Sequence, residues 1–120
     1  MFELKTLSRD AIPRSLEKAE RYRLLNEAAE AESICLDILA VDPDHQQALV
    51  MLLLARTDQF DQRMGIAVHE AEAVIPRLHG AFERAYYSGI ICERRARVRL
   101  DHGGPGSEFA AYDCFRTAMD

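Results

Sequence analysis

The sequence predicts an all-α protein, and three features carry this prediction. Apolar residues recur at three- and four-residue steps over several long stretches, as they do on one face of a helix. No stretch of useful length shows the alternation of apolar and polar residues that is typical of strands. Breaks near residues 26, 42–44, 58–61, 79–80 and 101–107 divide the chain into helix-sized pieces. We therefore expect six helices arranged as three antiparallel hairpins.

Length and composition indicate one globular domain. The chain has 120 residues, of which 48% are hydrophobic and 29% charged, so it is long enough to bury an ordinary core. The net charge of −5 argues against wholesale electrostatic binding of nucleic acid or acidic lipid. Three scattered cysteines give no sign of a disulfide framework. With no signal sequence or membrane-spanning run in sight, we expect a cytoplasmic protein.

We predict an N-terminal arm over residues 1–11, followed by one helical domain over residues 12–120. Within the domain, the breaks place the three hairpins at about residues 12–43, 44–79 and 80–120. The arm contains three spaced apolar residues, and its sequence fits either the start of a helix or a segment that packs against the domain. Both alternatives remain open from the sequence alone.

The first hairpin has clear helix boundaries. Its first helix is expected over residues 12–25, where a proline in the first turn is tolerated because its missing N–H would have no partner there. Asn26 tolerates the left-handed backbone conformation that ends helices, and it can also cap the next helix. That helix is expected over residues 27–41. Pro43 ends it, and Asp44 can cap the helix that follows.

The second hairpin begins with the most apolar stretch of the chain. The helix expected over residues 45–57 is apolar on all sides in its middle, which is typical of a helix that is buried on several sides. Residues 58–61 are interpreted as a loop. The next helix is expected over residues 62–77, where Pro76 ends or kinks it.

The third hairpin is expected to contain the longest helix, over residues 81–100, and a last helix from residue 108 to near the end. The intervening residues 101–107 contain three glycines and a proline, which is the strongest loop signal in the chain. Ser107 can cap the last helix as a plain N-cap.

The spacing of residues in the first hairpin resembles the tetratricopeptide repeat (TPR), a helical hairpin of about 34 residues. In its second helix that repeat has alanine, an aromatic residue and alanine at steps of four and three, followed by proline. The residues at these positions here are Ala31, Cys35, Ile38 and Pro43. The later hairpins have Ala67, Ala71 and Val74, and Ala111, Phe115 and Ala118. Lys18 departs from the pattern, because a large apolar residue is usual there. An irregular helical bundle that carries one such hairpin is the alternative.

The resemblance implies a protein-interaction adaptor and not an enzyme. In the repeat family the first helices of successive hairpins line a concave groove, which here would hold a peptide or a helix of a partner protein. The resemblance maps this face onto Leu16, Glu20, Arg23, Gln47, Val50, Leu54, Tyr86, Ile90 and Arg97. The expected partner contacts are Val50, Leu54, Tyr86 and Ile90 as apolar anchors, with Arg94 and Arg97 as charges at the rim.

Other interpretations of the same residues stay open. Val50, Leu54 and Ile90 are equally well explained as core residues, or as a surface covered by the N-terminal arm. A second copy of the chain can also cover them, which would make the domain a self-associating unit of a larger assembly. The arginines near residue 97 fit a solvated face beside a helix C-terminus, and they can also steer an acidic partner.

No motif predicts catalysis, a cofactor or a metal. The four histidines lack the spacing of a helical metal pair, and no HExxH, phosphate loop or nucleophile motif is present. No aromatic platform for nucleic acid is interleaved with the arginines. We therefore expect no catalytic residues, no cofactor, no metal site, no nucleic-acid partner and no membrane contact. A metal or redox site assembled from histidine and cysteine in three dimensions is the third alternative.

Overall fold

The computed structural model describes residues 8–101, and all regular structure in this range is helical. Its elements are η1 Arg9–Ala11, α1 Ile12–Leu24, α2 Ala28–Val41, α3 Gln46–Thr57, α4 Phe60–Glu72, η2 Ile75–Arg77 and α5 Ala81–Asp101, where η denotes a short 3-10 helix. The all-α class is therefore confirmed over these residues, which contain no strand. The last expected helix, from residue 108 onward, lies outside the described residues, as does most of the expected N-terminal arm.

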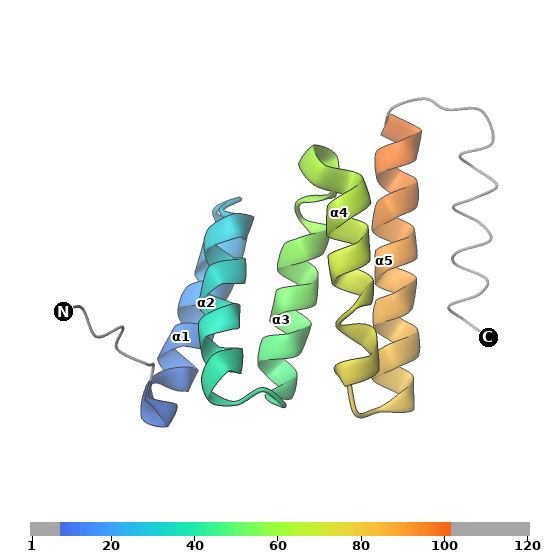
Figure 1. The fold of residues 1–120 in the computed structure, drawn as a ribbon. Coiled ribbons are helices and arrows are strands. Elements are labelled where there is room, and N and C mark those ends of the chain that lie inside the picture. Colours follow the sequence, from blue (N-terminus) through green and yellow to red (C-terminus); the bar gives the residue numbers. More distant parts are fainter. Residues whose placement is uncertain (1–7, 102–120) are drawn as a thin grey trace.

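Consecutive helices run in opposite directions and pack side by side, so the chain advances across the molecule from α1 to α5 (Figure 1). Each helix contacts the next one in the sequence, and α3 also contacts both α1 and α5. Because two reversals separate α1 from α3 and α3 from α5, these three helices point in the same direction (Figure 1). We call the surface that they share the odd-helix face.

The position of α3 explains why it is apolar on all sides. Its neighbours surround it, and Leu49, Leu52 and Leu53 are completely buried. The same core cluster includes the buried small and aliphatic residues of the neighbouring helices: Ala19, Ala31, Cys35, Ile38, Ala67 and Ala71. Burial of each large aliphatic side chain contributes about 1.5–3 kcal/mol, so α3 makes the largest contribution to the core.

The connections between helices differ from the predicted caps. Asn26 adopts the left-handed conformation expected of it, with φ 61°. The prediction that it caps α2 is wrong, because α2 begins one residue later and has no side-chain cap. Asp44 does not cap α3 either. Its neighbour His45 has the extended backbone of an N-cap residue, and its Nδ1 accepts a hydrogen bond from the N–H of Ala48 at 3.1 Å. The Asp44 carboxylate instead lies 2.8 Å from Nε2 of His79.

The predicted bounds of α4 need correction at both ends. Phe60, which was interpreted as part of a loop, is buried and begins the helix, because its ring joins the core. The backbone is non-helical at Arg63 (φ −141°, ψ 43°), close to the expected start. At the other end α4 stops at Glu72, and a 3-10 turn containing Pro76 follows. A proline ring clashes with the carbonyl four residues before it, and for Pro76 that residue is Glu72.

Candidate docking site

The odd-helix face contains a cavity of about 550 Å³ between the N-terminal halves of α1 and α3 and the start of α5. Its apolar walls are Pro13, Leu16, Val50, Met51, Leu78 and Tyr87. Several of these side chains also pack against the core, so the walls are supported by the fold and not by loose surface residues. Cavities of roughly 300–1,000 Å³ with mainly apolar walls are typical of binding sites.

The polar residues around this cavity are acidic or neutral. They are Glu17 and Glu20 of α1, Gln46 and Gln47 of α3, and Glu83 of α5. The three glutamates and Gln47 are exposed, so the cavity opens to solvent along this edge. Within residues 8–101, no lysine or arginine lines the cavity. Within the described part of the chain, none of the three glutamates forms an ion pair.

A second cavity, of about 320 Å³, lies at the C-terminal ends of α1 and α3 and the corresponding part of α5. Arg94 and Arg97, which were expected at the rim of a groove, both line it together with Arg23. These arginines have carboxylate partners. Arg23 Nε donates to Asp58 Oδ2 at 2.7 Å, and Arg94 Nη1 lies 3.8 Å from Asp58 Oδ1. Arg97 pairs with Glu93. Much of the positive charge in this cavity is therefore balanced from within the fold.

The four apolar contacts expected from the sequence have different environments. Val50 lines the apolar cavity. Leu54, one turn further along α3, packs against the core and lines none of the cavities described here. Ile90 is half-buried and lines neither cavity. Tyr86 is exposed and lies beside the apolar cavity, where it contacts the cavity residue Tyr87.

Three aromatic residues at the start of α5 extend the apolar surface beyond the cavity. The rings of Phe82 and Tyr86 stack with centroids 6.1 Å apart, although these residues are 75% and 51% exposed. The rings of Tyr86 and Tyr87 meet edge to face at 5.0 Å. We call Phe82, Tyr86 and Tyr87 the aromatic ledge. Burial, together with the nearby Tyr86 and Glu83, raises the pKa of the Tyr87 phenol, so its hydroxyl stays neutral at physiological pH.

Sequence reasoning missed several cavity residues, among them Met51, Glu83 and Tyr87. The repeat pattern placed Val50 and Tyr86 on the groove. Each of these residues comes immediately before a cavity residue that the pattern missed, Met51 or Tyr87. One residue along a helix corresponds to a rotation of about 100°, so a small error in the assumed orientation of α5 selects a different face. The four-residue spacing of Glu83 and Tyr87, which puts both on one face of a helix, was the available signal.

Among residues 8–101, no group of three or more histidine, cysteine, aspartate or glutamate side chains is placed to hold a metal ion. Over the same described range, no helix is both long and apolar enough to cross a membrane.

Comparisons of this chain with protein-family models, curated proteins and solved structures give no significant match.

Proposed function

We propose that this domain is a cytoplasmic adaptor that binds a peptide or helix of a partner protein on its odd-helix face and catalyses no reaction. The observation that carries the proposal is the cavity of about 550 Å³, whose walls are apolar and whose edge is open to solvent. Apolar side chains of a partner that enter this cavity would leave water, which contributes roughly 25 cal/mol for each Å² of apolar surface buried. The half-exposed aromatic ledge would add to this contact.

We further propose that the helices form a short TPR-like array. Two observations support this arrangement. Ala31 and Ala71, two of the small residues at the expected contact positions, are completely buried. The first helices of successive hairpins, α1, α3 and α5, are in contact, as neighbouring repeats require. We predict that residues 108–120 contain the second helix of the third hairpin, and that the hairpins stack as a short right-handed superhelix.

The proposal is tested by filling the cavity without disturbing the core. Gln47 lines the cavity and is exposed, so Gln47→Trp places an indole at the opening while the buried residues stay unchanged. The matched control is Asp37→Trp, because Asp37 is exposed on α2 and lines none of the cavities described here. Pull-downs from native extract are compared by mass spectrometry for the wild type and both variants, after circular dichroism shows equal helix content.

A partner that is captured by the wild type and by Asp37→Trp, and is lost with Gln47→Trp, would support the adaptor function and locate its site. The same proteins captured by all three baits would exclude the cavity as the binding site. A charged substitution at Leu54, another expected contact, would be a poorer test, because Leu54 packs against the core and a charge there would destabilise the fold.

Self-association is a second candidate function, and exposed leucines on the first hairpin favour it. Leu24, Leu25 and Leu36 are all large, apolar and exposed. The end of a short helical array needs a cover, and a second copy of the chain can supply it. Light scattering distinguishes the two candidates. A dimer that dissociates in a Leu24→Ser/Leu36→Ser variant would favour self-association, whereas a monomer at every concentration would exclude it.

A further inference from the structure

We propose that the occupant of the apolar cavity is a basic amphipathic helix of a partner protein, with apolar side chains in the cavity and lysine or arginine side chains beside Glu17, Glu20 and Glu83. This inference rests on the proposed adaptor function and specifies the chemistry of its partner. It differs from the acidic partner that the arginines of α5 indicate from the sequence.

The two cavities of the odd-helix face differ in charge. Among the described residues, the lining of the apolar cavity contains three glutamates and no lysine or arginine. None of these glutamates has an ion-pair partner within residues 8–101, although Arg14, Lys18 and Arg21 are exposed elsewhere on α1. The arginines of the second cavity, in contrast, pair with carboxylates of the chain itself. Among residues 8–101, the unpaired charge that lines the apolar cavity is therefore negative.

The apolar surface next to these carboxylates also favours a helix as the occupant. The aromatic ledge continues the apolar wall outward from Tyr87 to Tyr86 and Phe82, whose rings are more than half exposed. A helix that binds in a groove uses apolar anchors at three- and four-residue steps, and its opposite edges stay accessible. We expect anchors of this kind to occupy both the cavity and the ledge. Lysine or arginine side chains beside the anchors would reach the glutamates and the faces of the exposed rings, which attract cations.

The test uses synthetic peptides and the full chain. The probe is an amphipathic model helix of about 18 residues with leucines on one face and lysines on the other, and its partner peptide has glutamate in place of every lysine. Affinities are measured by isothermal titration calorimetry at low and at physiological salt. We expect the lysine peptide to bind more tightly, and we expect its affinity to fall as salt is added, because exposed ion pairs are screened.

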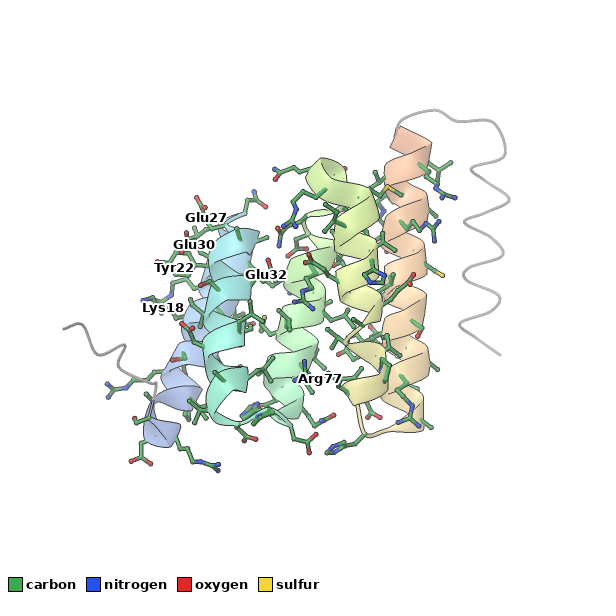
Figure 2. The ribbon with its side chains drawn as sticks, viewed as in Figure 1. Lys18, Tyr22, Glu27, Glu30, Glu32 and Arg77 are labelled. Atoms are coloured by element: carbon green, nitrogen blue, oxygen red, sulfur yellow. The ribbon has the colours of Figure 1, made fainter. Side chains whose placement is uncertain are left out.

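Two double variants assign this preference to the cavity. Glu17→Gln/Glu20→Gln removes two carboxylates at the cavity, three residues apart on α1. The control Glu27→Gln/Glu30→Gln removes two carboxylates with the same spacing from the outer side of the first hairpin. Figure 2 shows that both of these side chains point away from α3. We expect the cavity variant to bind the lysine peptide about fivefold more weakly, as two exposed ion pairs of modest strength would give. We expect the control to bind it as the wild type does.

The outcomes separate the charge inference from the adaptor function. Equal affinity for both peptides, or tighter binding of the glutamate peptide, would overturn the basic partner and leave the adaptor function standing. Equal losses in the two double variants would overturn the assignment to this cavity. If neither peptide binds, both the inference and the proposed groove fail. A Phe82→Ala/Tyr86→Ala variant, whose changes lie at exposed positions, should weaken both peptides, and unchanged binding would remove the ledge from the site.

Discussion

At the scale of single residues, one guanidinium group connects three helices. Arg56 of α3 donates from Nε to Glu32 Oε2 of α2 at 2.9 Å, and from Nη1 to the backbone oxygen of Glu70 in α4, also at 2.9 Å. Glu32 lies on the side of α2 that faces α3 (Figure 2), and Gln59 donates to its other oxygen at 3.2 Å. The side chains of Arg56 and Glu32 are only 15% and 14% exposed, so water cannot readily replace either partner.

We expect Arg56→Met to lower the free energy of unfolding by about 1–3 kcal/mol, because it leaves the Glu32 carboxylate and the Glu70 carbonyl short of a donor. The matched control is Arg63→Met. The Arg63 side chain is 43% exposed and its contact with Glu70 is longer, at 3.4 Å, so its loss should cost no more than about 0.5 kcal/mol. Urea unfolding measures both values. Equal destabilisation by the two variants would show that the contacts of Arg56 with Glu32 and Glu70 contribute no more to stability than the exposed contact of Arg63.

Cys35 is a buried thiol within the core, and this position determines its reactivity. Burial, assisted by the negative charge of Glu32, raises its pKa from 9.0 to about 12. A thiol whose pKa is raised on folding adds stability below pH 9, and this contribution is lost as the pH rises from 9 towards 12. The thiol is therefore neutral and inaccessible under ordinary conditions.

We expect Cys35 to stay unmodified by iodoacetamide in the folded protein at pH 8 and to react once urea unfolds the chain. Labelling should also become faster above pH 9, because the contribution of the neutral thiol to the free energy of unfolding falls there. Peptide mass spectrometry follows each cysteine separately. Rapid modification of Cys35 in the folded protein at pH 8 would contradict the buried position.

At the scale of elements, the turn between α1 and α2 depends on one backbone conformation. Asn26 follows the end of α1 with φ 61°, a conformation that costs most residues about 1 kcal/mol or more and that asparagine and glycine tolerate. The N–H of Glu27 then donates to the Tyr22 carbonyl at 2.8 Å, which closes the helix end. The reversal that makes α1 and α2 a hairpin is therefore decided locally.

We expect Asn26→Gly to leave the melting temperature unchanged or slightly higher. Asn26→Val should destabilise the protein by about 1–2 kcal/mol, because a β-branched residue is strained at positive φ. Thermal unfolding followed by circular dichroism gives both results. Asn26 is exposed, so packing changes do not obscure the comparison. A valine variant as stable as the glycine variant would mean that the turn adopts another conformation.

At the scale of the whole molecule, α3 occupies the central position in the described structure. It contacts α1, α2, α4 and α5, whereas each of the other helices contacts chiefly its neighbours in sequence. In such an arrangement, the free energy of unfolding is approximately the sum of the stabilities of the hairpins and of the interfaces between them. The two ends are therefore the parts that unfold locally most easily. The completely buried leucines of α3 therefore report on the unfolding of the whole array.

We expect the amide hydrogens of α3 around Leu52 and Leu53 to exchange most slowly with solvent, and those of α1 to exchange faster. The reason is that α1 can open without disrupting α4 or α5, which it hardly contacts. Hydrogen–deuterium exchange with peptide mass spectrometry measures the order. Protection of α1 equal to that of α3 would indicate that residues 8–101 unfold as one cooperative unit.

The sequence by itself determined the helical class and most helix positions, because these depend on local chemistry. Apolar spacing, the φ preference of Asn26, and the restrictions imposed by Pro43 and Pro76 act within a few residues, so they can be recognised in a linear chain. The all-apolar middle of α3 also indicated its central burial, which the structure confirms.

Only the tertiary structure decided which side chains meet. The burial of Phe60, the pairing of Arg23 and Arg94 with Asp58, and a cavity that places Glu17 beside Met51 and Tyr87 all join residues from different helices. Such contacts depend on how far each helix is rotated about its axis. Packing of the whole core sets that rotation, and a rotation of about 100° exchanges one residue for the next. Spacing within one helix therefore could not select the residues that line the cavity, and the assembled core did.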